Sequence, residues 1–111
     1  MSLRVDVDKH FISFVAHTVN YKQLEETLYE VDESQFIVLR EIALNIISIP
    51  GVIYLTVNTR KHLEPYWKTL EQLAAGDFTR KRLKENAFLI AEICRLTLHY
   101  YCTQLQKNTL T

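Results

Sequence analysis

The sequence predicts an all-α fold, a compact helical bundle of four to six helices in a single domain that spans residues 1–111. Apolar residues recur at helical spacing through most of the chain. Only two glycines and two prolines interrupt it, and the 30 residues from Phe78 to Lys107 contain neither. With 48% apolar residues, the chain can bury a core without disulfides or a bound metal.

An extended arm and two helical segments are expected in the first third of the chain. Residues 3–7 alternate between apolar and charged side chains, which predicts a short N-terminal extended arm. Asp6 or Asp8 is then a suitable cap for a helix that runs to about Val19. A second segment, Tyr21–Glu30, forms a separate helix or continues the first after a bend. The apolar residues expected to form the buried face of these segments are Phe11, Phe14, Val15, Leu24, Leu28 and Val31.

The next helix begins at Asp32 or Ser34 and ends at the Pro50-Gly51 pair. Between Phe36 and Ile49 almost every side chain is apolar, so this helix is expected to be central to the fold. The polar residues expected to form one line facing water or a partner are Glu41, Asn45 and Ser48. Residues 52–58 have the composition of a strand, but a helix is favoured because an isolated two-stranded ribbon is rarely stable.

The last third predicts a helix that opens at Glu64-Pro65 and ends at Gly76, followed by a long C-terminal helix. Asp77 or Thr79 is expected to cap this final helix, which runs to about Lys107. A helix of about 30 residues is about 45 Å long. The radius of gyration of a domain of this size is roughly 13 Å. One end of the helix is therefore expected to project from the domain or to be covered by a second subunit.

The charges cancel overall but are unevenly distributed. Thirteen acidic and thirteen basic residues give no net charge, so no global field attracts polyanions. Residues 1–36 contain seven acids and three bases, a net charge of −4, and the other 75 residues contain ten bases and six acids, a net charge of +4. The opposite net charges of the two parts are expected to compensate each other within the chain, or through head-to-tail pairing with a second copy.

A cytoplasmic protein without a membrane span is expected. The first ten residues lack the apolar stretch of a signal peptide. The uncharged run 42–59 contains Pro50-Gly51, which would leave backbone groups unpaired in lipid. Cys94 and Cys102 lie eight residues apart on the expected last helix. That separation is about 12 Å, too far for a disulfide with each other, so both are expected to be reduced.

No catalytic, cofactor-binding or metal site is expected, and the chain is not predicted to be an enzyme. Phosphate-binding and dinucleotide-binding loops need glycines, and the chain has two. Asp6, His10 and His17 share a helical face, but they spread over about 16 Å and cannot meet at one metal ion.

Two glutamates lie within the two most apolar helices. Glu41 and Glu92 each have an arginine near them, Arg40 and Arg95. If the two helices pack together, a structural ion pair inside or at the edge of the core is expected. The alternative is a carboxylate pair that performs acid–base chemistry.

Two adjacent aromatic pairs are expected to supply a protein interface. The four residues are Tyr66, Trp67, Tyr100 and Tyr101. Neighbours on a helix point about 100° apart, so one member of a pair can pack in the core while the other faces outward. Exposed Tyr and Trp are typical of interface hot spots. The chain is therefore predicted to be a small regulatory or adaptor protein that associates with another protein and with itself, as a homodimer.

A basic segment supports an alternative function. Arg80, Lys81, Arg82 and Lys84 lie in the first turns of the expected final helix and could contact phosphates. In this alternative the chain is a dimeric nucleic-acid-binding protein. A helix-turn-helix register around Gly76 fits poorly, because Arg82 stands where an apolar core residue is needed. A small-ligand pocket between helices is a third alternative.

Overall fold

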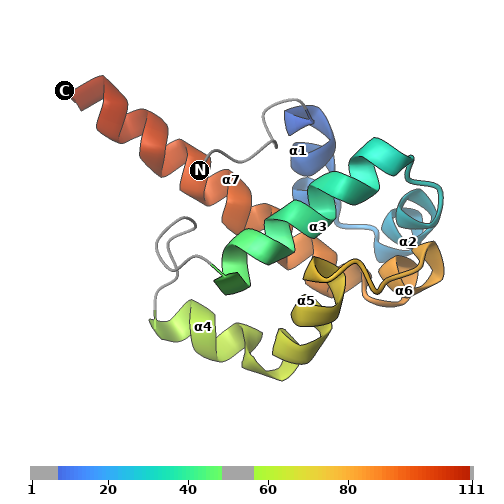
Figure 1. Cartoon of the computed structure of the whole chain (residues 1–111). Helices are drawn as coiled ribbons and strands as arrows, with labels where there is room; N and C mark the ends of the chain where they lie inside the picture. Colours follow the sequence, from blue (N-terminus) through green and yellow to red (C-terminus); the bar gives the residue numbers. More distant parts are fainter. Residues whose placement is uncertain (1–7, 49–56, 111) are drawn as a thin grey trace.

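The computed structural model describes residues 8–48 and 57–110; for Ser48, Val57, Thr59 and residues 101–110 it describes only the backbone. These ranges form helices and no strand, which confirms the all-α fold and the long last helix (Figure 1). The expected arm and most of the segment 52–58 lie outside the described residues. The elements are α1 (Lys9–His17), α2 (Tyr21–Tyr29), α3 (Glu33–Ser48), α4 (Val57–Leu63), the 3-10 helix η2 (Glu64–Tyr66), α5 (Trp67–Ala74), α6 (Arg80–Glu85) and α7 (Ala87–Leu110).

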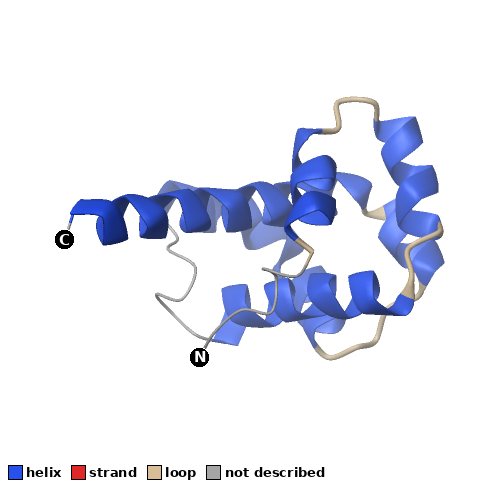
Figure 2. Cartoon of the chain, turned by 90° about the horizontal axis from the view of Figure 1, so that it is seen from above, coloured by secondary structure: helices blue, strands red, loops and turns tan. Residues whose placement is uncertain are grey.

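Helices α3 and α7 pack against each other and form the centre of the molecule. The other helices cover them: α1 packs along α7, α5 along α3, and α2 against both α6 and α7. Each of the seven α-helices contributes at least one fully buried aliphatic side chain. These side chains are Ile12, Leu24, Leu28, Leu39, Ile42, Leu63, Leu70, Leu73, Leu83, Leu89, Ile90 and Ile93. The C-terminal part of α7 extends beyond the other described helices, as its length led us to expect (Figure 2).

Helices α1 and α2 are separate. Thr18 has an extended backbone with φ −72° and ψ 121°, and the Asn20 side chain caps α2 by accepting a hydrogen bond from the Gln23 N–H. The expectation that Phe14 is buried is wrong, since it is 45% exposed. The buried residues of α1 are Phe11, Ile12, Val15 and Ala16. At 100° per residue, Phe14 lies about 130° from the centre of this stripe.

A capping box starts α3. The Asp32 carboxylate accepts hydrogen bonds from the Gln35 N–H at 2.8 Å and the Ser34 hydroxyl at 2.7 Å, and the Gln35 side chain accepts one from the Asp32 N–H. The hydrogen bonds from the Gln35 N–H and from Ser34 lower the pKa of Asp32 below its ordinary value of 3.8. Of the two residues expected to start this helix, Asp32 is therefore the cap.

The polar line expected on α3 does not face water throughout. Asn45 is 6% exposed; its amide group donates to the Glu41 carbonyl at 2.8 Å, and its Oδ1 has no hydrogen-bond partner. The expectation is wrong at Asn45 because α5 and α7 both pack against α3. Arg40 and Leu44 are the exposed residues in the middle of this helix instead.

Helix α5 ends at Gly76 as expected, in a Schellman motif. The Gly76 N–H donates to the Leu73 carbonyl and the Asp77 N–H donates to the Gln72 carbonyl. Gly76 has φ +81°, a conformation that residues with a β-carbon rarely adopt. A β-carbon at this position would also lie 3.1 Å from Nη1 of Arg40, whose side chain crosses the turn.

The stretch expected to form one final helix is divided at Asn86, which has φ −116° and ψ 30°. Thr79 caps the first part, α6, by accepting a hydrogen bond from the Arg82 N–H. The Asn86 side chain donates to the Arg82 carbonyl, and the Asn86 backbone carbonyl accepts from Ile90 N–H, so α7 begins at once. Asparagine side chains compete for backbone hydrogen bonds in this way and favour helix ends. The break lets α6 pack on α2 while α7 packs on α1.

We predict that Gly76→Ala lowers the free energy of unfolding by about 1 to 2 kcal/mol, because a β-carbon is strained in the left-handed conformation. Urea unfolding measures the change. Gly76→Asn is the matched control and should cost less, since asparagine tolerates this conformation better. Equal stability of Gly76→Ala and the wild type would contradict the left-handed turn.

A second prediction concerns pH. Because the pKa of Asp32 is lowered on folding, its carboxylate stabilises the fold above pH 3.8, and this contribution is lost as the pH falls through the folded-state pKa. Asp32→Asn keeps the cap but removes the charge. It should be less stable than the wild type at neutral pH, and the difference should vanish in acid. Urea unfolding across a pH series checks this, and a difference that persists unchanged in acid would contradict it.

Candidate interaction surface

Four rings from four different elements meet at one place on the surface, which we call the aromatic cluster: Tyr21, His62, Tyr66 and Phe88. Phe88 is central. Its ring centroid lies 6.2 Å from that of Tyr21, 6.4 Å from that of His62 and 6.2 Å from that of Tyr66. These separations are typical of favourable aromatic pairs. Phe88 is nevertheless 42% exposed and Tyr21 38% exposed, so the cluster presents its rings to the outside.

A polar network borders the aromatic cluster. Glu92, one turn after Phe88 on α7, forms an ion pair with Arg95, and its carboxylate lies 3.3 Å from the His62 Nε2. Arg95 also donates a hydrogen bond to the carbonyl of Ala16 at 3.1 Å and another to the Tyr21 hydroxyl. Partial burial by itself lowers the pKa of Arg95, but the hydrogen bonds with Glu92 and Tyr21 outweigh it and keep that pKa above its ordinary value.

The network fixes the cluster to the body of the protein. Through Glu92 and Arg95, helix α7 is tied to the end of α1, the start of α2 and helix α4. Glu92 and Arg95 form an ion pair within α7, at the edge of the core, whereas the expected ion pair between the helices of Glu41 and Glu92 is not formed in the described part of the chain, although α3 and α7 pack together. No ion pair of Glu41 or of Arg40 occurs in the described part of the chain.

The residues expected to form an interface lie in different surroundings. Tyr66 belongs to the aromatic cluster, whereas Trp67 is half-buried beside a hollow of about 470 Å³, with the Arg60 guanidinium 6.0 Å from its ring centre. Tyr100 is half-buried and packs against the core. The side chain of Tyr101 lies outside the described residues.

Sequence reasoning missed Tyr21 and Phe88. No local pattern connects Phe88 to Tyr21, 67 residues earlier. The contact between them depends on how α2 packs against α7, which a single sequence does not show.

The two arginines of the basic segment make contacts within the fold. The Arg80 Nε donates to the Val31 carbonyl at 2.9 Å. Arg82 donates to the Asp77 carbonyl and to the Gln72 side chain, and its guanidinium lies 4.2 Å from the Phe78 ring centre.

The two lysines of the segment are exposed. The Lys84 amino group lies 5.4 Å from the ring centre of Tyr29, which is itself 52% exposed. Lys81 and Lys84 border a hollow of about 380 Å³ together with Glu25 and Glu85. Because α2 is acidic and packs against the basic α6, part of the uneven charge is compensated within the chain.

The cysteines, the candidate metal ligands and the membrane question can be assessed in the described ranges. Cys94 is free, and its burial raises the pKa of the thiol to about 12, while the side chain of Cys102 is not described. No group of three or more His, Cys, Asp or Glu side chains within residues 8–48 and 57–110 is placed to hold a metal ion. Within the same ranges, no helix combines the length and apolar character needed to cross a membrane.

Comparison with protein-family models, curated proteins and solved structures finds no match to this chain.

We predict that Glu92→Gln lowers the free energy of unfolding by up to about 1 kcal/mol, because it leaves Arg95 without its anionic partner at a partly exposed site. Chemical unfolding at neutral pH measures the loss. Glu71→Gln, at an exposed position of α5, is the control and should change little. A Glu92→Gln variant as stable as the wild type would show that the network is not structural and would favour acid–base chemistry at Glu92.

Proposed function

We propose that this chain is a small non-enzymatic regulatory or adaptor protein that acts through protein–protein association, with a second copy of itself as the first partner. The aromatic cluster is the contact surface in this proposal. The observation that carries it is the exposure of Phe88 at the centre of three other rings. Clustered aromatic residues with an arginine at the border are the usual composition of interface hot spots.

The rigidity of the cluster supports this function. Its rings come from α2, α4, η2 and α7, and the network around Glu92 and Arg95 connects three of these helices. A partner would therefore meet side chains that are already ordered. A preformed surface loses less conformational entropy on binding, which leaves more of the contact energy for affinity.

The charges beside the cluster are compatible with self-association. A two-fold interface requires a patch that is complementary to itself. Glu92 and Arg95 place opposite charges within one turn of α7, next to Phe88. If two copies of α7 pair antiparallel about this turn, the Glu92 carboxylate of each copy approaches the Arg95 guanidinium of the other.

Nucleic-acid binding is the second candidate. Lys81 and Lys84 are exposed beside Tyr29, and a cation next to an exposed aromatic ring is typical of surfaces that stack on bases. Two features weaken this candidate. Several donors of Arg80 and Arg82 are engaged within the fold. The acids Glu25 and Glu85 border the same hollow as the lysines.

Sedimentation velocity over a concentration series tests the proposal. We predict that the wild type self-associates and that Phe88→Ala weakens association about tenfold or more, as expected for a central hot-spot residue. Tyr29→Ala is the matched control, because Tyr29 is an exposed aromatic residue at the other end of α2 from Tyr21, and it should associate like the wild type.

A wild type that stays monomeric at every concentration would contradict self-association. Equal weakening by Phe88→Ala and Tyr29→Ala would contradict the placement of the interface. Sedimentation with a short mixed-sequence duplex, at low and at high salt, distinguishes nucleic-acid binding from self-association. A duplex complex that weakens with salt and is lost in the double variant Lys81→Glu, Lys84→Glu would favour nucleic-acid binding.

A further inference from the structure

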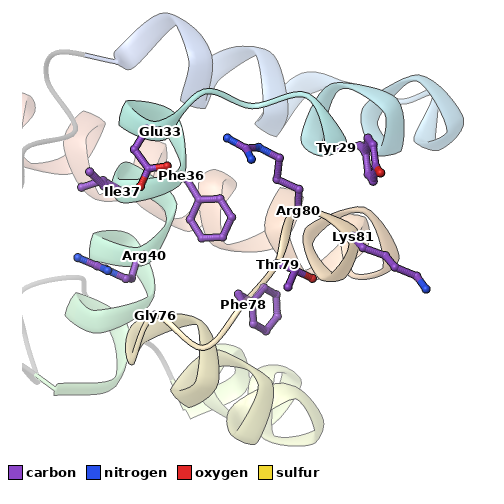
Figure 3. A pocket seen from close by; sticks show the side chains of 10 residues that line it. All are labelled: Tyr29, Glu33, Phe36, Ile37, Arg40, Gly76, Phe78, Thr79, Arg80 and Lys81. Atoms are coloured by element: carbon purple, nitrogen blue, oxygen red, sulfur yellow. The ribbon is translucent and has the colours of Figure 1, made fainter.

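A hollow separate from the aromatic cluster lies between α3, the turn from α5 to α6 and the start of α6. We call it the α3–α6 cavity. Its volume is about 710 Å³, and none of its lining residues belongs to the aromatic cluster (Figure 3). Sites for small molecules commonly have volumes of about 300 to 1,000 Å³. The lining residues are Tyr29, Glu33, Phe36, Ile37, Arg40, Gly76, Phe78, Thr79, Arg80 and Lys81.

Two phenylalanine rings provide apolar walls. Phe36 and Phe78 are both half-buried, and Figure 3 shows the Phe36 ring extending from α3 toward the turn and the Phe78 ring lying beside the turn that carries it. The Arg82 guanidinium lies 4.2 Å from the centre of the Phe78 ring. This contact holds the Phe78 ring in place without filling the cavity, since Arg82 is not among the lining residues.

Three cationic side chains are among the lining residues, and Figure 3 shows them extending in different directions, with that of Lys81 directed away from the cavity. Arg40, Arg80 and Lys81 line it together with one carboxylate, Glu33, so the lining has a net charge of +2. In the part of the chain that the structure describes, the ion pairs are those of Glu92 with His62 and Arg95. None of the three cations of the cavity forms an ion pair with a carboxylate within that part, although Arg80 lies close enough to Asp32 to contribute to the lowered pKa of that carboxyl.

Arg80 is held ready to bind an anion. Its Nε donates to the Val31 carbonyl at 2.9 Å, which fixes the plane of the guanidinium. The two terminal nitrogens retain donors for a ligand. Figure 3 shows the Arg80 side chain extending from the start of α6 toward the chain just before α3, and Phe36 is another of the lining residues.

Gly76 contributes to the same cavity. The Arg40 side chain passes over this residue, and a β-carbon there would lie 3.1 Å from the Arg40 Nη1. The absence of a side chain thus keeps Arg40 at the edge of the cavity. The conformation of the turn and the shape of the cavity therefore depend on the same glycine.

We propose that the α3–α6 cavity binds a small organic anion, namely a carboxylate or phosphate group attached to a flat apolar body of aryl size. The anionic group lies against Arg80, with Arg40 and Lys81 adding to the positive potential, and the apolar body lies between Phe36 and Phe78. A small anion fits better than an extended polyanion, because Glu33 lines the cavity and Glu25 and Glu85 line the adjoining hollow.

Titration of the isotope-labelled protein with phenyl phosphate, followed by amide NMR shifts, tests this inference. We predict saturable shifts at Gly76, Phe78, Thr79 and Arg80. Inorganic phosphate, which lacks the ring, and benzyl alcohol, which lacks the charge, should each bind about tenfold more weakly or worse. Equal binding of inorganic phosphate would overturn the role of the phenylalanines, and equal binding of benzyl alcohol would overturn the role of the cations.

Variants test the assigned contacts. Arg80→Gln should weaken phenyl phosphate binding about tenfold, as expected when a charge-assisted contact is lost. Because Arg80 also contributes a hydrogen bond to the fold, Lys81→Gln and Arg40→Gln provide independent tests, and each should weaken binding by a smaller factor.

Lys68→Gln, at an exposed position of α5 outside the cavity, is the control and should bind like the wild type. No saturable shift with phenyl phosphate, or shifts centred on Phe88, would overturn the inference. Because the cavity and the aromatic cluster share no residue, failure of either experiment leaves the other unaffected.

Discussion

The enclosure of α3 and the first half of α7 is the constraint on which the rest of this structure depends. Both helices are apolar on nearly every side, and a single contact cannot bury such a surface. The covering helices are short, between six and nine residues, and helices of that length are not stable alone. Each is held because it contributes an aliphatic side chain to the core around α3 and α7.

Arginine side chains complete this arrangement where helices end. The last carbonyl groups of a helix have no partner within it, and cations are favoured there by the helix dipole. Arg95 donates to a carbonyl at the end of α1, Arg80 to one just after α2, and the Arg40 side chain crosses the turn after α5. Three of the ten basic residues in the last two thirds of the chain therefore contribute to the packing of helices as well as to the surface.

Both surfaces with potential function lie beside interruptions of helical structure. The break at Asn86 starts α7 in a new direction and places Phe88 in its first turn, where it meets rings from α2, α4 and η2. The left-handed turn at Gly76 directs the chain to Phe78, which lines the α3–α6 cavity together with Phe36. The proposed association through the aromatic cluster and the proposed binding of an organic anion in the cavity thus rest on separate local features.

The sequence by itself determined the all-α fold and the turn at Gly76, and it offered Asp32 and Thr79 each as one of two possible caps; it did not predict the break at Asn86. The fold class, the turn and the caps depend on hydrogen bonds and side-chain periodicity within a few residues, and a sequence displays both directly. Of the four residues of the aromatic cluster, the sequence indicated Tyr66 as an interface residue. Only the tertiary structure decided that Phe14 faces outward, that Tyr21 and Phe88 meet, and that Arg80 and Arg82 contact the fold. The physical reason is that exposure and side-chain partners depend on packing between helices that are distant along the chain.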